Sequence, residues 1–279
     1  MTVLLQISDT HFGTEQPPVV AALLALAAQQ RPDLVVLSGD VTQRARPAQF
    51  RAAHGFVRQL GIPLVAVPGN HDIPLYDLFT RLVRPYARFR SVFGNDIEPV
   101  HGAGDLLVVC VKTTRRYRHV NGEVSSEQVE RVAARLAKAT ARQLRIVVVH
   151  QPVAVLRESD AHDLLRGCGA ALKAWSAAGC DLVLGGHIHL PYVIELHQPT
   201  GSIWAVQAGT ALSSRVRGGI GNSINILRWN GAAAERCCAV ERWDFTPDRQ
   251  TFMHVMTTEA RLGALAAPTF EGQGSASAT

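Results

Sequence analysis

The sequence predicts a layered α/β domain built on two β-sheets. Up to about residue 190, short apolar runs alternate with stretches of helical periodicity. The runs are rich in Val, Ile and Leu and end in polar residues, which is typical of strands buried on both faces. After about residue 190, strand-like segments follow one another through turns, which indicates antiparallel pairing.

The alternating part contains six predicted strands, at 3–8, 33–38, 63–67, 106–111, 145–149 and 181–186. Helices are predicted at 18–30, 47–60, 75–93, 125–139 and 161–178. The fourth helix has a clear start, because Ser125 and Gln128 match a capping box. The segment 75–93 is less regular and mixes arginines with aromatic residues. It fits a cap over a site, an amphipathic lid for a lipid or a partner, or a surface helix that buries its aromatic side chains.

The C-terminal part contains four further predicted strands, at 192–196, 202–208, 223–229 and 237–245. We expect them to form a second, antiparallel sheet that packs on the first. The sequence contains no internal repeat and no evident linker. It therefore predicts a single domain over residues 1–258, with 75–100 as a candidate cap segment. The small and polar residues 259–279 predict a flexible tail.

Composition narrows the range of functions. The chain has 279 residues, a formal net charge of +5 and a pI near 9.2, which favours anionic ligands. No basic run is long enough to indicate a nucleic-acid polymer as ligand. Five cysteines without C-x-x-C spacing predict neither a disulfide framework nor a structural zinc site, which fits a cytoplasmic protein. The start lacks signal-peptide features and no apolar run reaches membrane-spanning length, so we expect no membrane insertion.

Metal-binding side chains follow five of the six predicted strands, at the same end of each. They are Asp9 and His11, Asp40, Asn70 with His71 and Asp72, His150, and His187 with His189. In an open α/β sheet the carboxyl ends of the strands form the ligand-binding edge, so we expect these residues to converge on one crevice. Imidazole, carboxylate and amide groups together suit a first-row transition metal ion.

Each of these short motifs taken alone is more typical of a turn or a cap than of a site. The "GHIH" segment raises a further difficulty, because His187 and His189 would point to opposite faces of a continuing strand. The ordered set of motifs favours the metal site over the structural alternatives. We therefore expect Gly185 and Gly186 to bend the chain away from the sheet, so that both histidines can reach the site.

The ordered set D-x-H, G-D, G-N-H-D, H and G-H-x-H resembles the calcineurin-like metallophosphoesterase superfamily over about residues 3–215. The resemblance implies a four-layer α/β/β/α sandwich of two mixed sheets, with the metal site at the strand carboxyl ends. It also implies two divalent or mixed-valence transition metal ions, of Mn, Fe, Zn or Co. One metal would bind Asp9, His11 and His189, the other would bind Asn70, His150 and His187, and Asp40 would bridge both.

The resemblance further implies that a metal-bridging hydroxide attacks a phosphodiester, with Asp40 and His71 as catalytic residues. His71 would stabilise the developing charge or protonate the leaving group. Many protein phosphatases of the superfamily carry an acidic residue three positions after the bridging aspartate, where this chain has Gln43. A phosphomonoesterase is therefore the less favoured interpretation.

The sequences of these motifs are most similar to those of the bacterial class III cyclic nucleotide phosphodiesterase branch. This resemblance implies a cyclic nucleotide or another small nucleotide as substrate. Glycerophosphodiesters and nucleotide-sugar pyrophosphates are the alternatives, and a nuclease or a non-catalytic scaffold is less favoured. The candidate substrate contacts are Arg44, Arg217 and Tyr117, with the two-arginine segment 208–219 as a source of phosphate ligands. The sequence leaves open whether the chain is a monomer or a homodimer.

Overall fold

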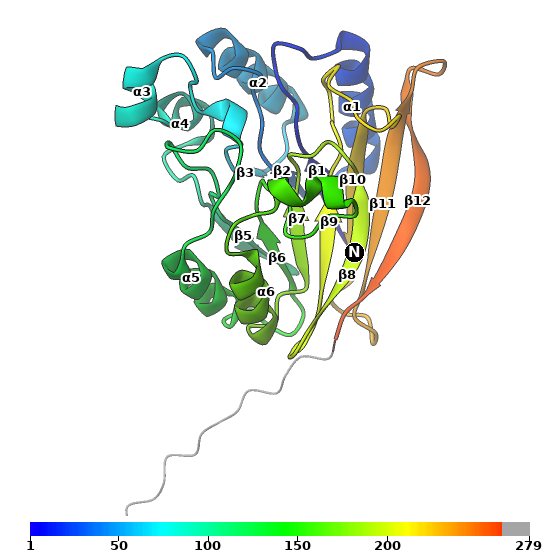
Figure 1. Cartoon of the computed structure of the whole chain (residues 1–279). Coiled ribbons are helices and arrows are strands. Elements are labelled where there is room, and N and C mark those ends of the chain that lie inside the picture. Colours follow the sequence, from blue (N-terminus) through cyan, green and yellow to red (C-terminus); the bar gives the residue numbers. More distant parts are fainter. Residues whose placement is uncertain (264–279) are drawn as a thin grey trace, which may run out of the picture.

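The computed structural model describes residues 1–263 and contains two six-stranded mixed sheets that pack face to face (Figure 1). The first sheet has the order β12-β11-β10-β1-β2-β3 and the second the order β4-β5-β6-β7-β9-β8. The strands of the first sheet are β1 (Thr2–Ile7), β2 (Leu34–Leu37), β3 (Leu64–Ala66), β10 (Ser223–Trp229), β11 (Cys237–Thr246) and β12 (Thr251–Arg261). Those of the second are β4 (Val100–Ala103), β5 (Leu106–Cys110), β6 (Leu144–Val148), β7 (Leu182–Gly185), β8 (Tyr192–Gln198) and β9 (Gly201–Gln207).

Helices cover the outer face of each sheet, which gives the expected α/β/β/α layering. The longer helices are α1 (Pro17–Gln30), α2 (Pro47–Leu60), α5 (Ser126–Leu136) and α6 (Cys168–Ala177). Helices α1 and α2 lie on the first sheet, whereas α5 and α6 lie on the second. The capping box of α5 is confirmed, because the Ser125 hydroxyl accepts from the Gln128 amide at 3.2 Å and the Gln128 side chain accepts in return at 3.1 Å.

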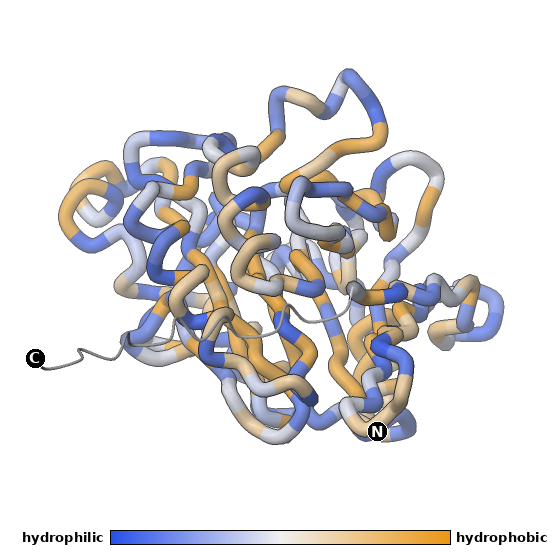
Figure 2. The backbone as a smooth tube through the Cα atoms, turned by 90° about the horizontal axis from the view of Figure 1, so that it is seen from below, coloured by the Kyte–Doolittle hydropathy of each residue, from blue (hydrophilic) through white to orange (hydrophobic). Residues whose placement is uncertain are grey.

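The alternation of side chains along each strand builds three apolar layers. In β1, Leu5 and Ile7 pack toward α1 and α2, whereas Leu4 packs between the two sheets against residues such as Ile146 and Leu184. The third layer lies between the second sheet and its helices, around the fully buried Trp175. Figure 2 shows many apolar segments in the interior, although apolar segments also occur at the periphery. Both sheets are thus rigid supports for the loops that leave their carboxyl ends.

The assignment of strands to sheets differs from the expectation. The C-terminal strands do not form a separate antiparallel sheet, because β8 and β9 join β7, while β10, β11 and β12 join β1. The parallel strands are correspondingly divided, with β1, β2 and β3 in one sheet and β5, β6 and β7 in the other. The reason is that apolar runs buried on both faces look alike whichever sheet they enter.

Several boundaries also differ from the sequence-based ones. The segment 75–93 forms two short helices, α3 (Leu78–Val83) and α4 (Ala87–Phe93), separated at Pro85, which interrupts helical hydrogen bonding. The predicted helix 161–178 is instead a 3-10 turn, η2 (Glu158–Asp163), followed by α6. Strands β4 and β12 were not expected, and β12 continues to Arg261, past the predicted start of the tail at 259. The rest of that tail, from 264, lies outside the described residues.

Candidate metal centre

Backbone hydrogen bonds join the loops after β1 and β2 in the first sheet and those after β6 and β7 in the second. In the first sheet the Asp9 amide donates to the Gly39 carbonyl at 3.1 Å, and the His11 amide donates to the Asp40 carbonyl at 3.0 Å. In the second sheet the Gly186 amide donates to the His150 carbonyl at 2.9 Å. The sheets are then connected across the sandwich, since the His187 amide donates to the Asp9 carboxylate at 3.0 Å. The predicted residues therefore do converge on one place.

Five of these residues have left-handed backbone conformations that non-glycine residues rarely adopt. Their φ angles are 51° at Asp9, 40° at His11, 48° at Asp40, 76° at His187 and 59° at His189. Such conformations cost on the order of 1 kcal/mol each and are maintained only where the surrounding structure imposes them. Their concentration in one cluster is typical of a functional site.

The backbone conformations of His187 and His189 explain how both side chains of the "GHIH" segment reach one place. The chain turns through the left-handed conformations of His187 and His189, whereas neither Gly185 nor Gly186 has a positive φ. Glycine is needed at 186 for another reason, because a Cβ there would collide with the side chains of Ser8 and Asp9. Close approach between the two sheets, and not a bend at the glycine pair, explains this glycine.

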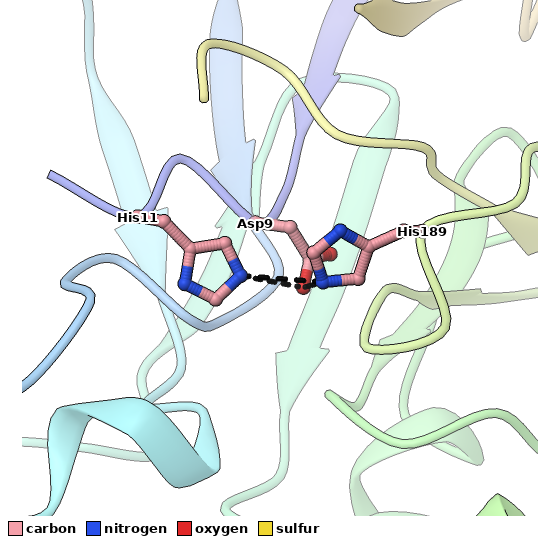
Figure 3. A group of neighbouring side chains, drawn as sticks. All are labelled: Asp9, His11 and His189. Atoms are coloured by element: carbon pink, nitrogen blue, oxygen red, sulfur yellow. Dashed lines mark hydrogen bonds and ion pairs between the residues drawn. The ribbon is translucent and has the colours of Figure 1, made fainter. Parts of the chain in front are cut away.

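The first group of side chains comprises Asp9, His11 and His189, all buried (Figure 3). The Nε2 atoms of the two histidines lie 3.3 Å apart, and Asp9 Oδ1 lies 3.7 Å from that of His11 and 3.5 Å from that of His189. His189 Nδ1 donates to the Arg215 carbonyl at 2.5 Å, so the lone pair of Nε2 can bind a metal. Burial lowers the pKa of His11 to about 3, so its ring is neutral.

The second group comprises Asp40, His150 and His187. His150 Nδ1 donates to the Ser38 carbonyl at 2.8 Å, and its Nε2 lies 3.3 Å from Asp40 Oδ1 and 3.2 Å from Asn70 Oδ1. Asp40 also reaches the first group, because its Oδ2 lies 3.8 Å from His11 Nε2. The carboxylate of Asp40 thus lies between the two groups, and Asn70 extends the second.

The second group carries a buried ion pair when it holds no cation. Burial alone would lower the pKa of His150, but the Asp40 carboxylate outweighs it and raises that pKa to about 9. Burial raises the pKa of Asp40, yet the facing rings of His150 and His71 bring it well below its usual value. The proton on His150 therefore occupies the direction that a metal ion would take.

The donor set fits two transition metal ions. Imidazole nitrogens, carboxylates and an amide oxygen are ligands that such ions accept together. One atom supports this fit directly: His187 Nδ1 is buried and has no hydrogen-bond partner within residues 1–263, whereas its Nε2 lies 3.4 Å from Asp163 Oδ1. A buried imidazole nitrogen without a partner is costly unless it binds something. The residues present therefore fit the two metal-binding positions.

Asp72, which follows His71, organises the loop that carries Asp40. Its carboxylate accepts from the amides of Gly69, Val41 and Thr42 at 2.9, 3.0 and 2.8 Å. Burial, followed by the charge of Asp40, raises the pKa of Asp72 to about 6. The structure thus places Asp72 as an orienting group.

A cavity of about 440 Å³ opens over the two groups. It is lined by Asp40, Asn70, His71, Val120, Asp163, His187, Ile188, His189, Arg215, Val216 and Arg217. His71 Nδ1 donates to the Gln43 carbonyl at 2.8 Å, and its Nε2 lies 3.2 Å from Arg215 Nη1. Arg215 also lies 3.3 Å from Gln43 Oε1 and 3.4 Å from His11 Nε2, and it forms no ion pair with a carboxylate of residues 1–263. An unpaired guanidinium thus faces the metal-binding groups.

Of the three predicted substrate contacts, only Arg217 lines the cavity. Its guanidinium is paired with Asp160 at 2.6 Å and donates to the Ile188 carbonyl. Arg44 and Tyr117 are exposed and do not line this cavity. Sequence reasoning passed over Asp163, which lies in a predicted helix with no motif to mark it. It selected the segment of Arg215 but not the residue, because only the fold shows which of the two nearby arginines has a carboxylate partner among the described residues.

Comparison of the sequence with models of known protein families identifies the family of this chain. The model of the calcineurin-like phosphoesterases matches residues 2–191 of the chain. The chain belongs to the calcineurin-like phosphoesterase family. It is accordingly a metal-dependent phosphoester hydrolase, and the expected resemblance and fold class are confirmed.

Curated relatives of this calcineurin-like phosphoesterase include bacterial phosphodiesterases. A probable cyclic nucleotide phosphodiesterase of Synechococcus sp. is 27% identical over 68% of this chain and 74% of its own length. A cAMP/cGMP dual specificity phosphodiesterase of Mycobacterium tuberculosis is 26% identical over 67% of this chain and 61% of its own. A glycerophosphodiester phosphodiesterase of Enterobacter lignolyticus is 28% identical over 54% of this chain and 57% of its own. The chain thus aligns with less than two thirds of the last two relatives.

Solved structures agree on the fold. A dimetal phosphatase from Danio rerio superposes with a TM-score of 0.65 at 13% identity, covering 94% of this chain and 99% of the other. A purple acid phosphatase from yellow lupin gives 0.66 at 12% identity, covering 92% and 53%. Among the described residues, no helix has the length and apolar character needed to cross a membrane.

Proposed function

We propose that this calcineurin-like phosphoesterase hydrolyses small phosphodiesters, and cyclic nucleotides in particular. The observation that carries the proposal is the arrangement around Asp40. Two metal-binding groups share this carboxylate, and the cavity above them is faced by His71 and the unpaired guanidinium of Arg215. Each element has a distinct part in phosphodiester hydrolysis.

Asp9, His11 and His189 would hold one metal ion, Asn70, His150 and His187 would hold the other, and Asp40 would bind both. When bound, such a pair of ions supplies a nucleophilic water at neutral pH and Lewis-acid stabilisation of the phosphoryl oxygens. The hydrogen bonds of His150 and His189 to backbone carbonyls fix the orientation of their rings for this purpose.

Arg215 would bind a non-bridging phosphoryl oxygen. Its guanidinium contacts the side chains of Gln43 and His71, so it is oriented before substrate arrives. Because Gln43 is neutral, it does not compensate the positive charge of the guanidinium, which can therefore bind the phosphate. Charge-assisted hydrogen bonds of this kind become stronger as negative charge develops in the transition state.

His71 would serve the leaving-group oxygen. Its Nδ1 donates to the Gln43 carbonyl and its main-chain amide donates to Asp40 Oδ1 at 2.8 Å, so the ring is fixed with Nε2 toward the cavity. From this position the ring, when Nε2 also carries a proton, would stabilise the departing alkoxide or transfer that proton to it. A phosphodiester needs this assistance because both of its ester oxygens are poor leaving groups.

The cavity walls support a compact organic substituent on the phosphate. Val120, Ile188 and Val216 line it together with the polar groups, but no Phe, Tyr or Trp of residues 1–263 does. A base would therefore contact aliphatic side chains instead of stacking on an aromatic ring. The relatives named as cyclic nucleotide phosphodiesterases support this substrate class.

A glycerophosphodiester is the second candidate. The absence of Phe, Tyr and Trp among the described residues that line the cavity favours a substrate without a base, and one relative is named as a glycerophosphodiester phosphodiesterase. Both candidates share the phosphodiester, so they differ only in the groups that the apolar wall contacts.

A substrate panel with metal-reconstituted protein tests the proposal. The panel comprises bis-p-nitrophenyl phosphate, p-nitrophenyl phosphate, 3′,5′-cAMP, 2′,3′-cAMP, glycerophosphodiesters and a nucleotide-sugar pyrophosphate. We expect the highest kcat/KM among the cyclic nucleotides, and higher values for diesters than for the monoester. Faster hydrolysis of the monoester than of every diester would contradict the proposal.

A further inference from the structure

Helix α3 exposes its apolar side chains and buries its charged one, the reverse of an ordinary surface helix. Leu78, Phe79, Leu82 and Val83 are 65%, 75%, 57% and 57% exposed, and the preceding Tyr76 is 79% exposed. Arg81 is only 8% exposed. The helix lies at the outer edge of the molecule, at the upper left of Figure 1. A contiguous apolar surface of this kind indicates an interaction site.

Arginines attach this helix to the neighbouring loop 113–120. The guanidinium of Arg81 donates to the Pro74 carbonyl at 3.2 Å and to the Arg118 carbonyl at 2.7 Å. From the other side, Arg116 donates to the Leu82 carbonyl at 2.6 Å. Helix α3 and the loop therefore form one surface, to which the loop adds the exposed side chains of Tyr117 and Val120. We call this surface, residues 76–84 with 116–120, the α3 face.

The α3 face is basic as well as apolar. Arg84 and Arg116 are exposed, and neither forms an ion pair with any carboxylate in the described part of the chain. The nearby acidic residues are already engaged, since Asp77 pairs with Arg88 at 2.9 Å and Glu123 with Arg118 at 2.9 Å. The face therefore combines exposed large apolar side chains with unneutralised positive charge.

We infer that the α3 face docks this protein on an anionic lipid surface. Exposed aromatic and aliphatic side chains enter the boundary between headgroups and acyl chains, and arginines bind the lipid phosphates around them. A second copy of the chain fits this face poorly, because a two-fold contact buries the same surface of both copies and would place two copies of the unneutralised Arg84 and Arg116 in one interface. The docking is peripheral and involves no membrane-spanning segment.

The location of the α3 face links docking to the cavity. Val120 belongs to the loop of this face and also lines the cavity above the metal-binding groups. A docked molecule would therefore hold one rim of the cavity beside the lipid headgroups. Docking itself requires no turnover, so its test does not depend on the proposed substrate.

Co-sedimentation with vesicles tests the inference. We expect the full chain to bind vesicles of phosphatidylcholine mixed with phosphatidylglycerol, to bind phosphatidylcholine vesicles much less, and to lose binding at high salt. Phe79→Ser should lower the partition coefficient about tenfold through lost apolar burial. Arg84→Glu should lower it by about tenfold or more through charge reversal.

Two substitutions elsewhere on the surface serve as matched controls. Val255→Ser removes an apolar side chain of β12 that is 51% exposed, and Arg58→Glu reverses an exposed charge near the end of α2. Both should leave vesicle binding unchanged. All four variants should hydrolyse the soluble diester bis-p-nitrophenyl phosphate like the unmodified chain, which verifies folding.

Three results would overturn the inference. The first is absence of binding to the anionic vesicles. The second is equal loss of binding in the controls and in the variants of the α3 face. The third is a dimer in light scattering that Phe79→Ser converts to a monomer, which would assign the face to a second copy of the chain.

Discussion

The two metal-binding groups are built from the same residue types but differ in what they do without a cation. In the first group, burial lowers the pKa of His11 to about 3, so that ring already presents a lone pair. In the second, Asp40 raises the pKa of His150 to about 9, so the ring retains a proton that a cation must displace. The first group is therefore ready for a metal ion, whereas the second is neutralised by its own ion pair.

This difference arises from how closely the Asp40 carboxylate approaches the ring in each group. The Asp40 carboxylate accepts from the His71 amide at 2.8 Å and lies closer to His150 than to His11, at 3.3 against 3.8 Å. The groups also have different neighbours, because Arg215 anchors His189 in the first and His71 adjoins Asp40 in the second. Each neighbour can be removed separately, which makes the comparison testable.

The largest effect is expected from Asp40→Ala, which removes the carboxylate that both groups share. We expect kcat/KM for bis-p-nitrophenyl phosphate to fall by about 10⁴-fold or more, because residues of one catalytic unit fail together. Elemental analysis should show loss of metal from both positions. Retention of one tightly bound metal equivalent would show that Asp40 serves a single group.

The next largest effect is expected from His71→Ala. The rate should fall by about 10²- to 10⁴-fold while metal content stays unchanged, because His71 acts on the leaving group and is not a ligand. The loss should be smaller for a p-nitrophenolate leaving group than for an alkoxide. If the variant instead loses metal, His71 belongs to the second group and its proposed role is wrong.

A smaller loss is expected from Arg215→Ala, on the side of the first group. We expect kcat/KM to fall about 10²-fold, as for removal of one charged donor to the phosphoryl oxygens. His189 should still bind metal, because Arg215 anchors it through a main-chain carbonyl that the substitution retains. Arg217→Ala is the matched control and should have a weaker effect, since Asp160 already pairs with that guanidinium.

The smallest effect is a difference in pH dependence between the two groups. His150, with a pKa of about 9 before metal binding, must release its proton, so the affinity of the second group should rise about tenfold per pH unit from neutral pH to about pH 9. His11 has no proton to release there, so the first group should show a weaker slope. Calorimetric metal titrations at several pH values measure both slopes, and equal slopes would contradict the comparison.

The sequence by itself determined the layered α/β architecture and the family. The order of the strand-end motifs along the chain does not depend on which strands pair in each sheet. It also predicted that His187 and His189 belong to different groups, and the structure places them so. That prediction came from the family resemblance, which assigns the two histidines of G-H-x-H to different metals, whereas alternation along a strand only raised the question of how both could reach one site.

Tertiary structure alone decided the rest. Which strands share a sheet depends on edge pairing between segments far apart in sequence, such as β1 with β10 and β7 with β9. The turn at His187 and His189 depends on contacts from Ser8 and Asp9 of the other sheet. The choice of Arg215 over Arg217 depends on whether a nearby carboxylate, here Asp160, captures the guanidinium. The strand pairing, the turn and the choice of arginine depend on distances between segments that are remote in the chain. Local sequence patterns do not contain information on those distances.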